Sequence, residues 1–276
     1  MRGLAAVRTP RNALRSRLSP PHDGAVEVGA RRAKLEIERI ERAERKRRAL
    51  ERAHERLPAL IWRSPYFPLF QDVPTKEPRS PKKAPPFGNP SMFKSQKMGG
   101  RYIVCTAQPE LHLAYQCEFD DSVAAYVEQP FAIRYRCIDY VALHVPDMFV
   151  MRSGRPVVIQ AKTVVGAATA EWRSREPFIR AALEELGFSY ELRTSAELSV
   201  QPRLRNIRRR IDDRLRSLPD GVQRAQCHLQ TTGPQPLWAV SDAIGATLVD
   251  LRIMVAHRFL CADVDAEFDE DIVLKC

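Results

Sequence analysis

Asp147, Gln160 and Lys162 carry a carboxylate, an amide and an ammonium at the two ends of the segment VPDMFVMRSGRPVVIQAK. Ser153-Gly154 in its middle predicts a two-residue turn joining strands over Met148–Arg152 and Arg155–Lys162. A turn of this length places residue 152 opposite residue 155 and therefore Asp147 opposite Gln160. Opposed residues have Cβ atoms about 4.5–5.5 Å apart, and Lys162 projects from the same side of its strand as Gln160. The three polar groups are therefore expected to converge.

Magnesium prefers oxygen ligands, and this hairpin offers the Asp147 carboxylate, the Gln160 side-chain oxygen and the Ala161 backbone carbonyl. A cation held there polarises a phosphate and lowers the pKa of a bound water. Lys162 would orient that water or stabilise charge on the phosphate oxygens. The same spacing also fits an edge hairpin whose polar residues merely form a wet face, with Val157, Ile159 and Ala161 on the other face.

The segment resembles the PD-(D/E)xK core of restriction-endonuclease-like folds, and glutamine in place of the usual acid resembles the TnsA family of transposase endonuclease subunits. Upstream, FKSQKMGGRYIV, a helix with Glu110, and CEFDDSVAAYVEQPFAIRY follow the order of that family. The resemblance spans about Phe93 to Cys276. It implies an α/β fold, namely a restriction-endonuclease-like mixed sheet with flanking helices. It also implies that Glu110 is the acid of the helix and a further metal ligand, with Glu118 as the alternative.

By this resemblance the chain is a Mg²⁺-dependent endodeoxyribonuclease, for which Mn²⁺ can substitute, that hydrolyses DNA at transposon ends. Its partners would be a DDE-type transposase like TnsB and an ATPase regulator like TnsC. Two alternatives remain open. One is a stand-alone restriction or repair nuclease that uses the same site, and the other is a non-catalytic DNA or protein adaptor in which Gln160 has replaced a needed acid.

The elements that would position these residues alternate between strands and helices, which predicts a nuclease domain over 92–200. Pro109 suits the first turn of a helix that carries Glu110. A second helix is predicted over Glu176–Leu186, since Gly187 is a good residue to follow a helix end. The predicted strands outside the hairpin cover Ile103–Ala107, Val123–Val127, Phe131–Cys137 and Phe188–Arg193.

The last third predicts a small winged-helix-like domain over 201–276. The expected elements are helices over Arg203–Leu218, Leu237–Ile244 and Thr247–His257, and strands near Phe259–Val264 and Ile272–Leu274. Arg252, His257 and Arg258 are candidate DNA contacts. Because acids repel phosphate, an acidic wing favours docking on a protein partner instead. The acids of this wing are Asp263, Asp265, Glu267, Asp269, Glu270 and Asp271.

The net charge of +10 comes from the front of the chain, where residues 1–100 hold 23 Lys/Arg against 10 Asp/Glu. We expect a basic arm over 1–57, including an exposed charged helix from Ala30 to Leu57, which either binds DNA phosphates or is simply solvated. Residues 58–90 hold nine prolines, which predicts a linker over 58–91. No apolar run is long enough to span a membrane, so a soluble cytoplasmic protein is expected.

Overall fold

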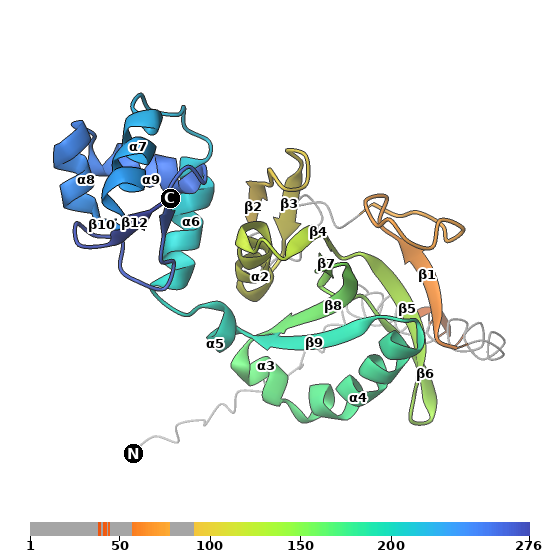
Figure 1. Cartoon of the computed structure of the whole chain (residues 1–276). Helices are drawn as coiled ribbons and strands as arrows, with labels where there is room; N and C mark the ends of the chain where they lie inside the picture. The colour runs from red at the N-terminus through yellow and green to blue at the C-terminus, as the bar shows by residue number, and fades with distance from the viewer. Residues whose placement is uncertain (1–37, 40, 43, 45–56, 78–90) are drawn as a thin grey trace, which may run out of the picture. The chain divides into compact units, whose positions relative to one another are not determined.

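The computed structural model describes residues 38–39, 41–42, 44, 57–77 and 91–276. The chain divides into two compact units, Met1–Glu55 and Arg56–Cys276. In the first unit the described residues are helical and exposed; the rest of the predicted basic arm and charged helix lies outside the described residues, as do residues 78–90 of the predicted linker. The second unit is a mixed α/β structure (Figure 1).

The elements of the second unit keep the labels of Figure 1. Its strands are β1 (Ala59–Arg63), β2 (Ser91–Lys94), β3 (Tyr102–Cys105), β4 (Val123–Glu128), β5 (Phe131–Cys137), β6 (Tyr140–His144), β7 (Met148–Arg152), β8 (Arg155–Lys162), β9 (Ser189–Thr194), β10 (Gln235–Pro236), β11 (Cys261–Ala262) and β12 (Val273–Lys275). Its helices are α2 (Gln108–Phe119), α3 (Val164–Ala168), α4 (Ala170–Glu185), α5 (Ser195–Leu198), α6 (Arg203–Asp213), α7 (Val222–Thr232), α8 (Leu237–Ile244) and α9 (Leu248–Ala256).

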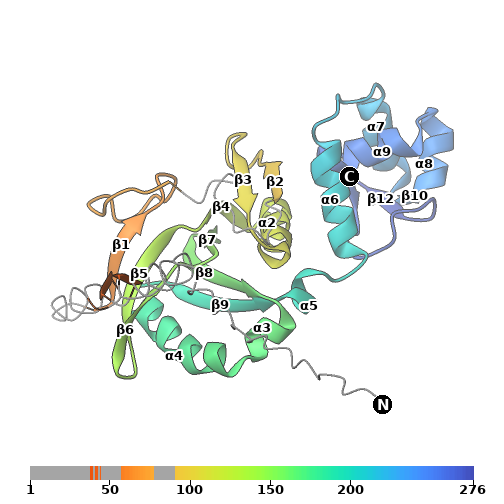
Figure 2. The same cartoon turned by 180° about the vertical axis from the view of Figure 1, so that it is seen from behind.

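The central sheet has the strand order β4-β7-β8-β9, in which only the β8–β9 pair is parallel. Strand β8 sends alternate side chains into two different cores. Val157, Ile159 and Ala161 pack with α2, whereas Val158 packs with α4 and strand β5. Strand β8 is buried on both faces. The hairpin therefore lacks the solvent-exposed face that the edge-hairpin alternative required. Helix α2 covers one face of this sheet and α4 lies against the other (Figures 1 and 2).

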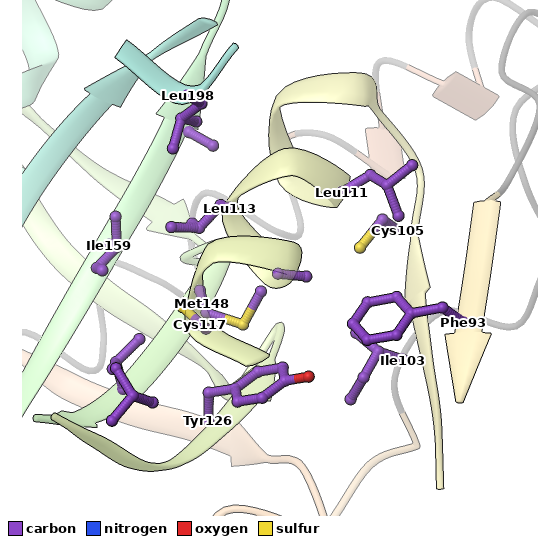
Figure 3. Packing of buried hydrophobic residues seen from close by; sticks show 14 of the residues in the cluster. Phe93, Ile103, Cys105, Leu111, Leu113, Cys117, Tyr126, Met148, Ile159 and Leu198 are labelled. Atoms are coloured by element: carbon purple, nitrogen blue, oxygen red, sulfur yellow. The ribbon is translucent and has the colours of Figure 1, made fainter. Parts of the chain in front are cut away.

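Helix α2 has the expected Pro109 in its first turn and buries a mostly apolar side. Its Leu113 and Cys117 lie toward Ile159 and Met148 of the sheet, and Phe93 and Ile103 of the β2–β3 hairpin close the core from the opposite side (Figure 3). Burial of each large apolar side chain contributes roughly 1.5–3 kcal/mol. This core fixes α2, and therefore the acids that it carries, against the hairpin of interest.

The predicted linker over 58–91 is wrong for residues 58–77. Strand β1 pairs antiparallel with β5, and Phe67 is only 1% exposed within a cluster of aromatic rings. Prolines exclude helix but are tolerated beside an edge strand. Burial of the apolar residues stabilises an ordered structure in this stretch, although its proline content predicted a linker.

Helix α4 starts at Ala170, six residues before the predicted start at Glu176. Its first turn is capped by the Thr169 hydroxyl, which accepts a hydrogen bond from the Trp172 backbone N–H. Pro177 then lies inside the helix, where it removes one backbone hydrogen bond. The cap and the burial of Trp172 and Ile179 offset that loss. Gly187 follows the helix end with φ +86°, as expected.

The C-terminal part has a core of its own, built from α7, α8, α9 and the small sheet β10-β12-β11. Helices α8 and α9 match the prediction, while α7 and β10 were not predicted and α6 ends at Asp213 rather than Leu218. Ile207 and Ile211 of α6 lie in the α2 core. The separate C-terminal core therefore begins only near Val222.

The three candidate DNA contacts of α9 and the residues that follow it are engaged inside the chain. Arg252 donates to the Asp213 carboxylate of α6, His257 Nε2 lies 3.2 Å from the Arg216 carbonyl, and Arg258 pairs with Asp121. These pairings use part of the charge of the three side chains, and their contact with DNA stays a prediction. Charge pairing with neighbouring elements, which the local sequence does not show, occupies them. In the described part of the chain, no helix is long and apolar enough to cross a membrane.

Candidate active site

The β7–β8 hairpin has the predicted register. Arg152 pairs with Arg155 and Met148 with Ile159, and the turn residues Ser153 and Gly154 have φ of +48° and +76°. Positive φ at both turn residues is the geometry that matches the twist of two antiparallel strands. The next pair beyond Met148 and Ile159 is Asp147 and Gln160.

The Asp147 carboxylate bridges to β8 through two donors. Its Oδ2 accepts a 2.8 Å hydrogen bond from the Ala161 backbone N–H and a short one from the Gln160 side-chain Nε2. The Asp147 backbone oxygen accepts a 2.9 Å bond from the Gln129 N–H at the end of β4. Both neighbouring strands therefore hold Asp147, β8 through its carboxylate and β4 through its backbone.

Pro146 explains why the strand ladder stops at this point. Register places Pro146 opposite Ala161, and a proline has no N–H to donate to the Ala161 carbonyl. The N–H and C=O of one strand residue point to the same edge of the strand. Because the Ala161 N–H points to Asp147, its carbonyl also points to that edge, where β7 supplies it with no donor.

Gln160 is buried, with 3% of its surface exposed, and its Oε1 has no hydrogen-bond partner. Next to it lies His144, the last residue of β6, which is 8% exposed and whose Nε2 also has no partner. Burial, and then the nearby Arg175 and Lys162 cations, lower the pKa of His144 to about 3, and a contact with the Gln160 side chain opposes that shift. At neutral pH the imidazole is therefore uncharged.

Lys162 ends β8 and places its ammonium 4.4 Å from the centre of the Trp172 ring. Trp172 comes from the first turn of α4 and also lies 6.1 Å from the His144 ring. A cation over an indole is stabilised by roughly 0.5–2 kcal/mol. The indole therefore restrains Lys162 near Asp147, whose pKa the ammonium acts to lower.

Glu110 approaches from α2, on the other face of the sheet. Its carboxylate accepts a 2.8 Å bond from the Thr106 N–H and 3.2 Å contacts from the Thr106 hydroxyl. Its charge still acts on Asp147. Burial, and then the Glu110 carboxylate, raise the pKa of Asp147 from 3.8 to about 7, against the opposing effects of Ala161, Lys162 and Gln160. The Glu110 charge therefore reaches the carboxylate at the end of the hairpin.

Glu118, the alternative helix acid, is fully used elsewhere. It is 1% exposed and faces the β2–β3 turn instead of the hairpin. Its carboxylate accepts hydrogen bonds at 2.5–3.1 Å and one longer ionic contact at 3.7 Å; the donors are Ser95, Gln96, Lys97, Tyr126 and Arg214. Of the two acids, Glu110 is the one placed to act with Asp147.

The donor set suits a hard divalent cation. Asp147 and Glu110 offer carboxylates, Ala161 offers a carbonyl, and Gln160 offers an amide oxygen without a partner. The amide now turns Nε2 toward Asp147, so it must rotate to present Oε1 there. Across the described residues, no three His, Cys, Asp or Glu side chains form a metal-binding group. A cation here would depend on amide and backbone oxygens.

Sequence reasoning missed His144 and Trp172. His144 stands three residues before Asp147, a spacing that in a strand does not by itself place two side chains together. Trp172 lies on a helix start that the prediction had placed later. Both are brought to the site by tertiary packing, since β6 belongs to the separate sheet β1-β5-β6.

Comparison with known proteins gives no further assignment: no protein-family model matches the sequence, and no curated protein matches it.

Proposed function

We propose that the chain is a TnsA-like, metal-dependent DNA endonuclease with a restriction-endonuclease-like core and a winged-helix-like C-terminal part. The observation that carries the proposal is the meeting of Asp147 with Gln160 and Ala161 at the open end of the β7–β8 hairpin. Glu110 and Lys162 act on the same carboxylate from two sides. A structural hairpin has no need for this concentration of buried polar groups, because each one left unpaired destabilises the fold.

Asp147, Gln160 and the Ala161 carbonyl would hold Mg²⁺ or Mn²⁺, with Glu110 as a further ligand. When bound, the cation would polarise the scissile phosphate and lower the pKa of an attacking water. Lys162 would contribute a positive charge to the phosphate oxygens, and the Trp172 ring would keep its ammonium in place.

By the resemblance over Phe93–Cys276, the substrate would be DNA at transposon ends, and the partners a TnsB-like transposase and a TnsC-like ATPase. The C-terminal part suits a protein partner better than DNA, because Arg252 and Arg258 are already paired within the chain. Its acids Asp265 and Glu267 are likewise paired, with Arg203 and Arg205.

The test is nicking of supercoiled plasmid by the full-length chain with Mg²⁺ or Mn²⁺. We expect nicking that Asp147→Ala and Lys162→Ala each abolish, while Lys94→Ala, an exposed lysine on β2, leaves it unchanged. Nicking that persists in both site variants contradicts the proposal. A chain that is silent alone is tested again with a TnsB-like transposase and a TnsC-like ATPase. Silence there as well favours the adaptor alternative.

A further inference from the structure

The Gln160 amide lies between the Asp147 carboxylate and the His144 ring, and its only hydrogen bond of good geometry is to the carboxylate. On one side its Nε2 donates to Asp147. On the other side its Oε1 and the His144 Nε2 are both buried without a partner of good geometry, although the two side chains are in contact. Each such unpaired buried group destabilises the fold. A small rotation of the imidazole would pair the two groups with each other.

An amide has nearly the same shape in two orientations that differ by a half turn, with its oxygen and nitrogen exchanged. In one orientation Gln160 donates to Asp147, and in the other it presents Oε1 on that side and Nε2 toward His144. In the first orientation Oε1 faces His144 and needs a donor there. In the second orientation Nε2 faces His144 and needs an acceptor there. An uncharged imidazole meets both needs, because its proton can reside on either ring nitrogen. Histidine is mostly uncharged at pH 8 even with its ordinary pKa of about 6.5.

We propose that His144 is a positioning residue, whose ring stabilises the Gln160 amide in the orientation that turns Oε1 toward Asp147 and a divalent cation. The inference rests on the proposed function, because it gives Gln160 a ligand role. It adds a residue that touches neither DNA nor the cation and acts only through Gln160.

The groups around His144 do not compete with its ring as acceptors for the Gln160 amide. The Trp172 ring covers one side at 6.1 Å, and the backbone of β6 is paired with β5 at Ile133. The charged groups that act on the ring are Arg175 and Lys162. Both are cations and neither accepts a hydrogen bond. Within the described part of the chain, His144 is therefore the group placed to accept from a rotated Gln160 amide.

The experiment measures Mn²⁺ binding to the full-length chain at pH 8 without DNA, from the electron paramagnetic resonance signal of free Mn²⁺. His144→Phe keeps an aromatic ring beside Trp172 but removes both nitrogens. We expect it to weaken Mn²⁺ binding by about 10–100-fold, the usual effect of losing a group that orients a ligand. His144→Gln, which can both donate and accept, should recover most of the affinity. Tyr190→Phe is the control, since it removes another buried, unpaired polar atom from the neighbouring strand β9 and should leave the affinity unchanged.

The outcomes separate the two proposals. A wild-type chain that binds no Mn²⁺ overturns the proposed metal site, and the inference with it. A wild-type chain that binds Mn²⁺ while His144→Phe binds it equally well overturns the inference alone. If His144→Phe does not fold, the ¹⁵N chemical shifts of the His144 ring in the wild type decide, with Ca²⁺ as the probe. A change of tautomer on Ca²⁺ addition supports the inference, and unchanged shifts contradict it.

Discussion

Asp147 and Glu118 are two acids on neighbouring elements, and their surroundings differ in opposite ways. Four hydrogen-bond donors and Arg214 surround the Glu118 carboxylate. Asp147 accepts two bonds through one oxygen, lies near a second carboxylate and has a raised pKa. The groups around it are also incompletely paired, since the Gln160 Oε1, the His144 Nε2 and the Trp172 Nε1 are buried without partners.

The difference separates a structural acid from one available for chemistry. A carboxylate that is fully paired holds its surroundings in place and has no capacity left for a ligand. A carboxylate with a raised pKa and unpaired neighbours destabilises the fold, and such an arrangement is typical of functional sites. The comparison therefore predicts opposite effects on stability when each acid is removed.

The largest effect is expected from Asp147→Asn. Under the proposed function it should reduce DNA cleavage by about 100–1,000-fold, the range seen when a key charge-stabilising group is removed. It should also stabilise the metal-free chain at pH 8. The raised pKa means that the folded chain holds this proton more tightly than the unfolded chain does. That contribution to stability is complete below the unfolded pKa near 3.8 and is lost as the pH rises to about 7.

Asparagine removes the ionisation. The free energy of unfolding of Asp147→Asn should therefore exceed that of the wild type by up to about 4 kcal/mol at pH 8, and the difference should become smaller toward pH 5. Urea denaturation in EDTA at the two pH values measures it. Equal or lower stability of the variant at pH 8 would show that Asp147 is as well satisfied as Glu118, and would remove the contrast between them.

Glu118→Ala should act in the opposite direction. It leaves the donors from Ser95, Tyr126 and the β2–β3 turn without an acceptor, and Arg214 without its partner, which we expect to destabilise the fold by about 3–5 kcal/mol. Urea denaturation measures the loss. Asp121→Ala is the matched control, because this exposed acid of the next turn pairs with Arg258 on the surface and should change stability by less than about 1 kcal/mol. Cleavage by folded Glu118→Ala should equal that of the wild type; a loss comparable to Asp147→Asn would make Glu118 the helix acid.

The sequence predicted the hairpin at the site better than its surroundings. The turn at Ser153-Gly154 specified the register locally, so the pairing of Asp147 with Gln160 followed from a count of residues. The choice between Glu110 and Glu118 did not follow, because it depends on where α2 lies on the sheet. His144 was missed for the same reason, since it belongs to a different sheet, and Trp172 was missed because α4 starts earlier than predicted. The linker prediction failed at Phe67, where burial among aromatic rings outweighs the local content of proline.

The smallest effect on cleavage is expected from a change at Trp172, whose ring lies beside Lys162, and not from a change at either acid. Trp172→Leu removes the ring beneath the Lys162 ammonium, and a cation–π contact of about 1 kcal/mol corresponds to roughly a fivefold loss of cleavage rate. Mn²⁺ affinity should not change, because the indole contacts the lysine and none of the oxygen ligands. Trp62→Leu is the control, since it removes a similar contact with Lys76 at 5.1 Å, away from the site. If Trp172→Leu weakened Mn²⁺ binding as strongly as cleavage, the ring would act through His144 and Gln160, and the unpaired groups around Asp147 would form one coupled network.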